Sequence, residues 1–397
     1  MKILLLENIH KVAKDLLEQE GYDVDLQPGA LNEGDLIEAA KSYDCIGLRS
    51  KTQVTEKVLH ANPHLFAVGA FCIGTNQIDT SSAARLGIPV FNAPYANTRS
   101  VAELVICEII GLARKVFHLN RQAHKGQWQK SAKSSYEVRG KTLGIVGYGH
   151  IGSQVSVLAE AMGMNVIYYD IIKKLPLGNS TPVESLECLL AESDFVSLHV
   201  PATELTTNMI QTKELNLMRK GAYLINASRG SVVDIDALNT AISEKHLAGA
   251  AIDVFPVEPK NNEEIFQSPL QEQENVILTP HIGGSTEEAQ ENIGREVADA
   301  FIRFLKMGST QASVNFPQAD LPLKSGVTRM LNVHKNVPGV LSEINKIVAS
   351  TGVNISSQYL ATNTEIGYLI MDIENEGAKG FSDEIAKLPN SIKTRLL

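Results

Sequence analysis

The chain has 397 residues, of which 44% are hydrophobic and 20% are charged, and its formal net charge at pH 7 is −9. This composition is typical of a globular protein and excludes a disordered or collagen-like chain. Since a domain has on the order of 150 residues, the length predicts two or three domains. The acidic balance argues against broad binding to nucleic acid or anionic membranes, so an anionic ligand needs a local basic site.

The N-terminus does not have the pattern of a secretory signal, because Glu7 directly follows the short apolar run Ile3–Leu6. The apolar runs of the sequence are far shorter than the roughly 20 residues of a membrane span. The four cysteines are scattered without CxxC spacing, which argues against a disulfide framework and a zinc site. These features predict a cytoplasmic protein with reduced thiols, no metal and no membrane partner.

The first hundred residues alternate short apolar strands with helical patterns. Strands are expected at 2–7, 22–27, 45–50 and 65–74, and helices at 11–20, 35–42 and 56–61. This βαβ alternation predicts a doubly wound parallel sheet. A single long helix is predicted over 100–125, which contains no proline.

A second alternation of strands and helices begins at Lys141 and predicts a second doubly wound, Rossmann-like domain. Its strands are expected at 142–149, 165–170, 195–200, 222–228, 248–255 and 275–281, and its helices at 151–162 and 183–191. A long helix over 287–306 then returns the chain to the first domain.

The last seventy or so residues follow the order βαββαβ, which is the ferredoxin-like arrangement. The predicted fold is therefore α/β, with two doubly wound domains and this C-terminal domain. The boundaries that we expect are 1–98 with 288–316, 99–287, a linker over 317–325, and 326–397.

Residues 147–152 read GYGHIG and fit the pattern GxGxxG, directly after an apolar strand and at the start of a helix. In this βαβ context the pattern is a dinucleotide-binding fingerprint. Gly147 makes the turn, Gly149 lets the backbone approach the pyrophosphate, and Gly152 lets the helix pack on the strand. The helix N-terminus attracts the phosphates.

Asp170 ends the next strand, where a carboxylate can accept hydrogen bonds from a ribose diol and repels a 2′-phosphate. The cofactor is therefore expected to be NAD and not NADP. Lys173 and Lys174 lie close by in sequence and keep NADP open at this stage.

Three charged residues follow strands of the second domain: Arg229 after LINAS, Glu258 after AAIDVF and His281 after VILTP. Ligands of open α/β sheets bind beyond the carboxyl ends of the strands, so the three can share one crevice. A histidine can take the hydroxyl proton of a 2-hydroxy acid, a carboxylate can orient the imidazole, and an arginine can bind the substrate carboxylate. Each residue alone is also compatible with an ordinary structural role.

The segments LINASRGSVVD, AAIDVFPVEP and LTPHIGGST resemble the D-isomer-specific 2-hydroxyacid dehydrogenase family, and the likeness extends over the whole chain. The resemblance implies that Arg229 binds and polarises substrate, Glu258 orients the histidine and His281 carries the proton. It also implies a set of cofactor contacts: His150, Ile151, Asp170, Ala227, Ser228, Arg229, Asp253, His281, Ile282, Gly283 and Gly284.

Members of this family that carry one C-terminal ACT domain are the most similar in pattern. They imply oxidation of 3-phospho-D-glycerate to 3-phosphohydroxypyruvate, the first committed step of L-serine biosynthesis, with 2-oxoglutarate reduction as a side activity. The implied substrate contacts are Arg49, Ser50, Lys51, Asn97 and Gln290. Lys51 stands where an arginine is common, and it keeps the positive charge but loses bidentate geometry.

The C-terminal segment resembles an ACT regulatory domain, and the effector implied by the resemblance is L-serine, bound at His334, Asn336 and Asn354. Both asparagines are also compatible with plain turn positions. The resemblance implies a homo-oligomer with paired ACT domains, for which we expect a tetramer, with a dimer left open. It places Trp128 at a subunit interface, with a core or surface position as the alternative.

Three other functions stay open at this stage. The chain could act on an unphosphorylated D-2-hydroxy acid, against which the ACT segment and Arg49 argue. It could be a catalytically idle NAD-binding regulator, against which the set Arg229, Glu258 and His281 argues. The ACT domain could serve assembly alone.

Overall fold

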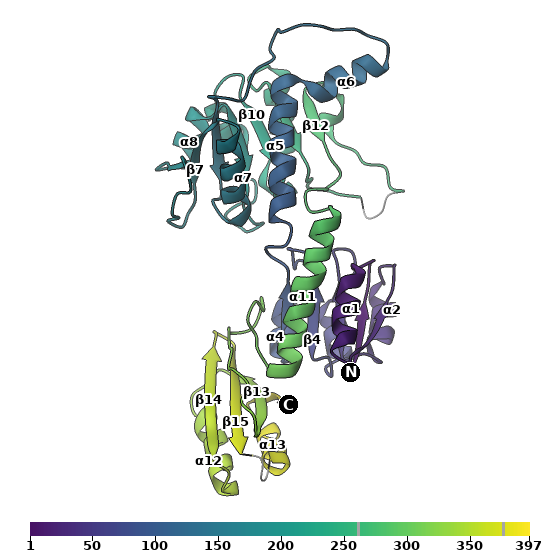
Figure 1. Ribbon diagram of the computed structural model, residues 1–397, viewed down its shortest axis with the longest axis vertical. Coiled ribbons are helices and arrows are strands. Elements are labelled where there is room, and N and C mark those ends of the chain that lie inside the picture. Colours follow the sequence, from purple (N-terminus) through teal and green to yellow (C-terminus); the bar gives the residue numbers. More distant parts are fainter. Residues whose placement is uncertain (260–262, 375–377) are drawn as a thin grey trace. The chain divides into compact units, whose positions relative to one another are not determined.

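The computed structural model describes residues 1–259, 263–374 and 378–397, and the chain forms two compact units (Figure 1). Unit 1 comprises residues 1–96 and 290–397, and unit 2 comprises residues 97–289. Each unit is built around its own sheet or sheets, and each is described by itself below.

The N-terminal part of unit 1 is a five-stranded parallel sheet with the order β2-β1-β3-β4-β5. Its central strands are apolar at every position because helices bury both faces. One face packs on α1 and α11, and the other packs on α2, α3 and α4. The bounds are β1 Lys2–Leu5, α1 Lys11–Gln19, β2 Asp23–Leu26, α2 Glu33–Ala40, β3 Cys45–Leu48, α3 Glu56–Ala61, β4 Ala67–Ala70, α4 Thr80–Arg85, β5 Val90–Asn92 and α11 Glu287–Met307.

Unit 2 holds a seven-stranded parallel sheet with the order β12-β11-β10-β9-β6-β7-β8. The strands β7 and β8 lie on one side of β6, and the strands β9 to β12 lie on its other side. The strand order therefore reverses between β6 and β9. Dinucleotides bind at this position in such sheets. Helices α5 and α7 cover one face, and α8, α9 and α10 cover the other. The bounds are α5 Thr98–Arg114, β6 Thr142–Val146, α7 His150–Ala161, β7 Asn165–Tyr169, β8 Thr181–Pro182, α8 Leu186–Glu192, β9 Phe195–Leu198, α9 Thr212–Leu217, β10 Tyr223–Asn226, η1 Gly230–Val232, α10 Ile235–Ser243, β11 Gly249–Ile252, η2 Pro269–Glu272 and β12 Val276–Leu278.

The single helix predicted over 100–125 is wrong, because α5 ends at Arg114 and a second helix, α6 (Val116–His124), begins after Lys115 (Figure 1). Lys115 has a φ of +53°, which ends a right-handed helix. The apolar stripe of α5 packs on the sheet, whereas α6 has no buried residue to hold it in the same direction. Trp128 follows α6 and is 87% exposed, so it is not a core residue of the single chain.

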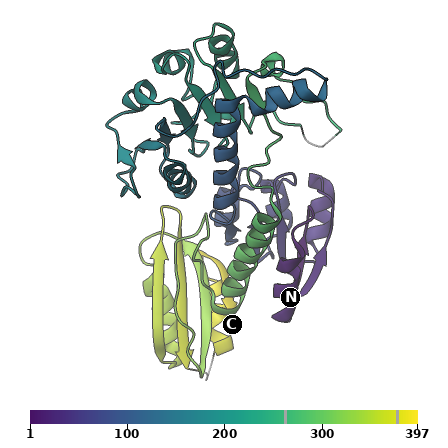
Figure 2. The same cartoon turned by 45° about the horizontal axis from the view of Figure 1, so that its top comes forward.

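The C-terminal part of unit 1 is a four-stranded antiparallel sheet with the order β14-β15-β13-β16 (Figure 2). One face packs on α12 and α13 through residues such as Met330 and Ile344. The other face packs, through residues such as Leu331 and Tyr368, on the core that also contains α11. The bounds are β13 Val327–Lys335, α12 Val340–Thr351, β14 Ile355–Thr362, β15 Ile366–Glu374, α13 Ala378–Ala386 and β16 Ser391–Leu396.

These three sheets confirm the predicted fold class of two doubly wound parallel sheets and one βαββαβ sheet. The four cysteines are all free thiols. Within the described ranges, no helix is both long enough and apolar enough to cross a membrane.

Candidate active site

The glycine turn after β6 lies at the point where the strand order reverses. Gly147 has a φ of +90°, and a Cβ added there would lie 2.4 Å from the carbonyl oxygen of His199, which follows β9. A Cβ on Gly152, in the first turn of α7, would lie 2.2 Å from the carbonyl oxygen of Gly147. Only glycine fits at either position, because the turn, the helix and the neighbouring strand approach at backbone distance.

Gly149 differs from the other two glycines, since, apart from Gly149 itself, its chain neighbours and the nearby backbone of α7, no described atom lies within 4 Å of the position where its Cβ would be. It is the N-cap of α7 and offers no side chain of its own to the first turn. The next residues are His150, which is exposed, and Ile151, which is half-buried. Open space at a helix N-terminus fits an anionic pyrophosphate.

Asp170 directly follows β7 and is tied to the glycine turn. Its Oδ2 accepts a hydrogen bond from the backbone N–H of Tyr148 at 2.8 Å, and its Oδ1 accepts one from Ile172 at 2.9 Å. A carboxylate oxygen has two lone pairs, so each oxygen can still accept a ribose hydroxyl. The turn and Asp170 together fit the pyrophosphate and ribose of NAD.

His281 and Glu258 are in direct contact, with the imidazole Nδ1 2.8 Å from Oε2 of the carboxylate. The other carboxylate oxygen accepts the backbone N–H of Phe255 at 3.0 Å, which fixes Glu258 in the turn after β11. This contact leaves the Nε2 of His281 as the ring nitrogen that can exchange a proton with a ligand.

The pair favours the charged form of each partner. The hydrogen bond that His281 donates to Glu258 raises the pKa of His281 above its ordinary value, against an opposing effect of burial. Burial acts to raise the pKa of Glu258, but hydrogen bonds from His281 and from the Phe255 amide lower it overall. The contact with Glu258 thus favours the protonated form of the imidazole.

Arg229 follows β10, and its positive charge adds to the lowering of the pKa of Glu258 and partly offsets the rise in the pKa of His281. The next residue, Gly230, allows this approach, because a Cβ there would lie 2.0 Å from the carbonyl carbon of Phe255. Nη1 of Arg229 donates to the carbonyl oxygen of Ser228 at 2.7 Å. The structure therefore brings Arg229, Glu258 and His281 together from the ends of three strands.

Asp253 organises the loop that carries His281. Its Oδ1 accepts the backbone N–H of Ile282 at 2.8 Å, and its Oδ2 accepts that of Gly283 at 2.9 Å. The backbone N–H of His281 donates to the carbonyl oxygen of Asp253 at 2.8 Å. These contacts hold His281 at a φ of +54°, a left-handed conformation that is uncommon for a residue with a Cβ.

Asn97 lies against the same loop at the N-terminus of α5. A Cβ on Gly284 would lie 2.5 Å from its Nδ2, and its Oδ1 is buried without a hydrogen-bond partner among the described residues. A buried amide oxygen without a partner is a group that a ligand can satisfy.

Comparison with known proteins places the chain among dehydrogenases. Residues 106–283 match the NAD-binding domain of D-isomer specific 2-hydroxyacid dehydrogenases, and residues 330–393 match an AHAS small subunit-like ACT domain. Over its full length the chain is 52% identical to the D-3-phosphoglycerate dehydrogenase of Dictyostelium discoideum and 54% identical to that of Escherichia coli K12, and it covers 97% of each. The chain belongs to the D-isomer specific 2-hydroxyacid dehydrogenase family.

Solved structures agree with this assignment. The fold matches the crystal structure of D-lactate dehydrogenase from Aquifex aeolicus complexed with NAD and lactic acid, with a TM-score of 0.69 and 29% identity. The match covers 80% of this chain and 100% of that chain. This family member is therefore an NAD-dependent oxidoreductase with a C-terminal ACT domain, as the sequence predicts.

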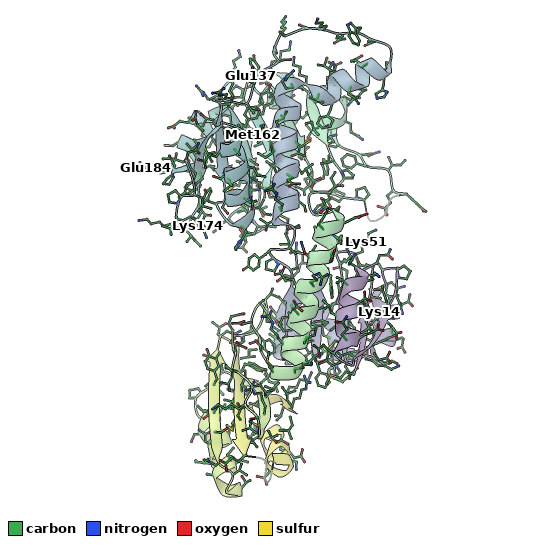
Figure 3. The ribbon with its side chains drawn as sticks, in the orientation of Figure 1. Lys14, Lys51, Glu137, Met162, Lys174 and Glu184 are labelled. Atoms are coloured by element: carbon green, nitrogen blue, oxygen red, sulfur yellow. The ribbon has the colours of Figure 1, made fainter. Side chains whose placement is uncertain are left out.

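The expected substrate contacts lie in both units of this dehydrogenase. Arg49, Ser50 and Lys51 follow β3 in unit 1, where Arg49 is half-buried and the other two are exposed (Lys51 is labelled in Figure 3). Gln290 is half-buried in the first turn of α11, also in unit 1, whereas Asn97 belongs to unit 2.

The expected effector residues of the ACT domain do not all meet within one chain. His334 is buried, and its Nδ1 lies 2.9 Å from Oδ1 of Asn332. Asn336 follows the same strand, and its Nδ2 donates to the carbonyl oxygen of Asn363 at 2.6 Å. The side-chain NH₂ group of Asn354 donates to Glu374, which is the last residue of β15, whereas Asn336 lies near the first residue of β15, Ile366. At about 3.3 Å per residue, the two ends of β15 are about 25 Å apart.

Residue patterns alone did not single out two supporting side chains. Asn226, the last residue of β10, bonds both the backbone N–H and the hydroxyl of Ser228, while its Nδ2 donates to the carbonyl oxygen of Arg229. The hydroxyl of Thr279 donates to Asp253 at 2.7 Å. The sequence signal that could have identified them is a polar residue at the end of an apolar strand, as for Asn226, or directly after it, as for Thr279.

Proposed function

We propose that the chain catalyses the NAD-dependent oxidation of 3-phospho-D-glycerate to 3-phosphohydroxypyruvate, and the reverse reduction, as the first committed step of L-serine biosynthesis. The observation that carries the proposal is the contact of 2.8 Å between His281 and Glu258, with Arg229 beside it, in the NAD-binding domain. The names of the full-length relatives support the phosphorylated substrate.

In the oxidation, Nε2 of His281 takes the proton of the C2 hydroxyl. NAD, when bound, would supply the acceptor for the hydride that leaves C2. Glu258 holds the ring through Nδ1 and stabilises the imidazolium that forms. The products are the 2-oxo acid, NADH and one proton, which His281 returns to solvent. In the reduction, His281 donates this proton to the carbonyl oxygen.

Arg229 binds the substrate carboxylate and polarises the C2 oxygen, for which its planar fork of donors is suited. Arg49 binds the phosphate group, with Ser50, Lys51, Asn97 and Gln290 as further substrate contacts. A local cation is required because the protein as a whole carries a net charge of −9.

The proposal divides the chain by task. Residues 1–98 and 288–316 bind substrate, residues 99–287 bind NAD, residues 317–325 are a linker, and residues 326–397 are regulatory. We propose a cytoplasmic location, which the reduced cysteines of the sequence favour.

For regulation, we propose that L-serine binds at the ACT domain and inhibits the enzyme. His334 and Asn336 lie toward one end of the sheet and Asn354 lies toward the other. A site that contains all three therefore needs Asn354 from a second copy, which supports paired ACT domains in a homo-oligomer. We propose a tetramer, with Trp128 at a second interface.

The test is oxidation of NADH by the purified full chain with 3-phosphohydroxypyruvate, with and without L-serine. We expect turnover that serine suppresses, and a slower turnover with 2-oxoglutarate. Arg49→Ala should raise the KM for 3-phosphohydroxypyruvate more than the KM for 2-oxoglutarate, because only the first substrate carries a phosphate.

Each alternative has its own outcome in this assay. Turnover that serine does not change would leave the enzyme but make the ACT domain a scaffold. Turnover with unphosphorylated 2-oxo acids alone would replace the substrate. The absence of turnover with any 2-oxo acid, together with tight NADH binding, would indicate an NAD-binding regulator.

A further inference from the structure

The loop that carries Arg49 is held by a buried carboxylate from a distant part of the sequence. Oε2 of Glu7 accepts the backbone N–H of Lys51 at 3.0 Å, and Oε1 accepts that of Thr52 at 2.7 Å. Glu7 is only 7% exposed, and all three residues belong to unit 1. Hydrogen bonds to an ionised acceptor are roughly twice as strong as those between neutral groups, so this pair of bonds fixes the loop backbone firmly.

The backbone around Glu7 is strained in a way that serves this contact. Glu7 has a φ of +63° and Asn8 a φ of +52°, so two residues with side chains are left-handed in succession. A left-handed conformation is unfavourable for Glu7 and better tolerated by asparagine, and such conformations gather at ligand sites. The turn is held by a hydrogen bond from the Glu7 amide to the carbonyl oxygen of Gly29. This conformation directs the carboxylate back along the end of β3.

The opposite side of the loop is also fixed. Nε2 of Gln77 donates to the carbonyl oxygen of Arg49, and Gln77 is itself buried. The hydroxyl of Thr52, which is fully buried, accepts the backbone N–H of Leu31 at 3.2 Å. The residues between these anchors, Ser50 and Lys51, have exposed side chains. The loop is thus a rigid backbone segment that presents side chains of one charge.

We propose that Glu7 is a positioning residue for substrate: by binding the amides of Lys51 and Thr52, it fixes the backbone from which Arg49 reaches the anionic group of the substrate. This inference rests on the proposed function of Arg49. Because Glu7 already accepts these two amides, the proposal assigns the anion to the cationic side chains of the loop and not to these amides. Pre-ordering of a charged side chain removes an entropic loss from substrate binding.

The experiment compares Glu7→Ala, Glu7→Gln and Arg49→Ala with the double variant Glu7→Ala/Arg49→Ala. KM and kcat are measured with 3-phosphohydroxypyruvate, and Kd is measured for NADH. Val24→Ala is the control for loss of stability, because Val24 is buried in the core of the same unit. Hydrogen exchange at the backbone amides of Lys51 and Thr52 reports directly on the two hydrogen bonds that Glu7 accepts.

We expect Glu7→Ala to raise KM about tenfold, which corresponds to about 1.4 kcal/mol, with kcat within about threefold and the Kd of NADH unchanged. The KM of Glu7→Gln should lie between those of the parent protein and Glu7→Ala. The reason is that the amide oxygen of glutamine can accept one N–H while its NH₂ group repels the other. In the double variant KM should equal that of Arg49→Ala alone, because Glu7 acts through Arg49. In Glu7→Gln, exchange should accelerate at the amide that loses its acceptor, even if Glu7→Ala does not fold.

Two results would overturn the inference. One is that the KM of Glu7→Ala is no higher than that of Val24→Ala. If Glu7→Ala does not fold, the same comparison is made with Glu7→Gln. The other is an additive effect in the double variant, which would separate Glu7 from Arg49. By contrast, an unchanged KM in Arg49→Ala would contradict the proposed function itself, so the two failures are distinct.

Discussion

The guanidinium group of Arg329 and the carboxylate of Asp372 form a bidentate ion pair, with N···O distances of 2.6 and 2.8 Å and both side chains fully buried. The guanidinium also donates to the carbonyl oxygens of Met307, Leu321 and Pro322. One arginine on β13 thus joins the C-terminal sheet to the end of α11 and to the segment after it.

Removal of one partner should destabilise unit 1 strongly. Asp372→Asn leaves a buried guanidinium without its counter-charge, for which a loss of about 3–5 kcal/mol in the free energy of unfolding is expected. The control is Glu291→Gln, which removes the exposed pair of Arg295 and Glu291 and should cost less than about 1 kcal/mol. Urea unfolding of unit 1 measures both, and equal losses would contradict the prediction.

His281→Ala should lower kcat by about 10²–10⁴, the range for loss of a general acid–base group. The expectation follows from the contact of Nδ1 with Glu258, which orients the ring and leaves Nε2 toward a ligand. The Kd of NADH should change far less than kcat. Steady-state kinetics with fluorescence titration of NADH separates the two, and near-normal turnover would exclude His281 as the proton carrier.

Glu258→Gln should move the pH profile toward lower pH. In the parent protein the hydrogen bond from His281 to Glu258 raises the pKa of His281, so the loss of the negative charge should lower this pKa. Reduction needs protonated His281, so its kcat/KM falls as the pH rises through the pKa, and this fall should begin at lower pH in the variant. For oxidation, which needs the neutral ring, the rise with pH should also begin earlier. An unmoved profile would exclude the coupling.

Substitutions of two glycines of the fingerprint should affect different properties of the protein, namely NADH binding alone at Gly149 and also stability at Gly152. Gly149→Ala places a methyl group in open space at a φ of −81°, so folding should be unaffected while the Kd of NADH rises about tenfold or more. Gly152→Ala places it 2.2 Å from the carbonyl oxygen of Gly147, so stability should fall as well. Thermal unfolding and NADH titration test the pair, and similar thermal shifts for both would contradict it.

Local patterns were sufficient where the determining contacts lie close in sequence. The turn at Gly147 and the packing of Gly152 are set within a single strand–turn–helix unit, and both were expected from the spacing GxGxxG. Strands buried on both faces also stand out as apolar runs, so the two parallel sheets and the βαββαβ order were predictable. The order of the strands within each sheet was not predicted.

Patterns failed where a distant contact or its absence decides the outcome. The apolar residues after Ser100 continue past Arg114, yet the helix breaks at Lys115 because no core contacts α6. Patterns also do not give the antiparallel register that puts Asn336 and Asn354 at opposite ends of the sheet, and the role of both residues in effector binding stays a prediction.

The sequence by itself therefore determined the fold class and the cofactor class, because the βαβ alternation and the GxGxxG turn depend on hydrophobic periodicity and short-range spacing. The residues that we propose to carry the chemistry were named from their positions after strands and from the family resemblance. Tertiary structure alone decided which side chains support them. Glu7 and Lys51 are 44 residues apart, and Arg329 and Asp372 are 43 apart, so only the pairing of β1 with β3 and of β13 with β15 brings each contact about. A buried polar group is stable only with its partner, and that partner is chosen by the folded backbone.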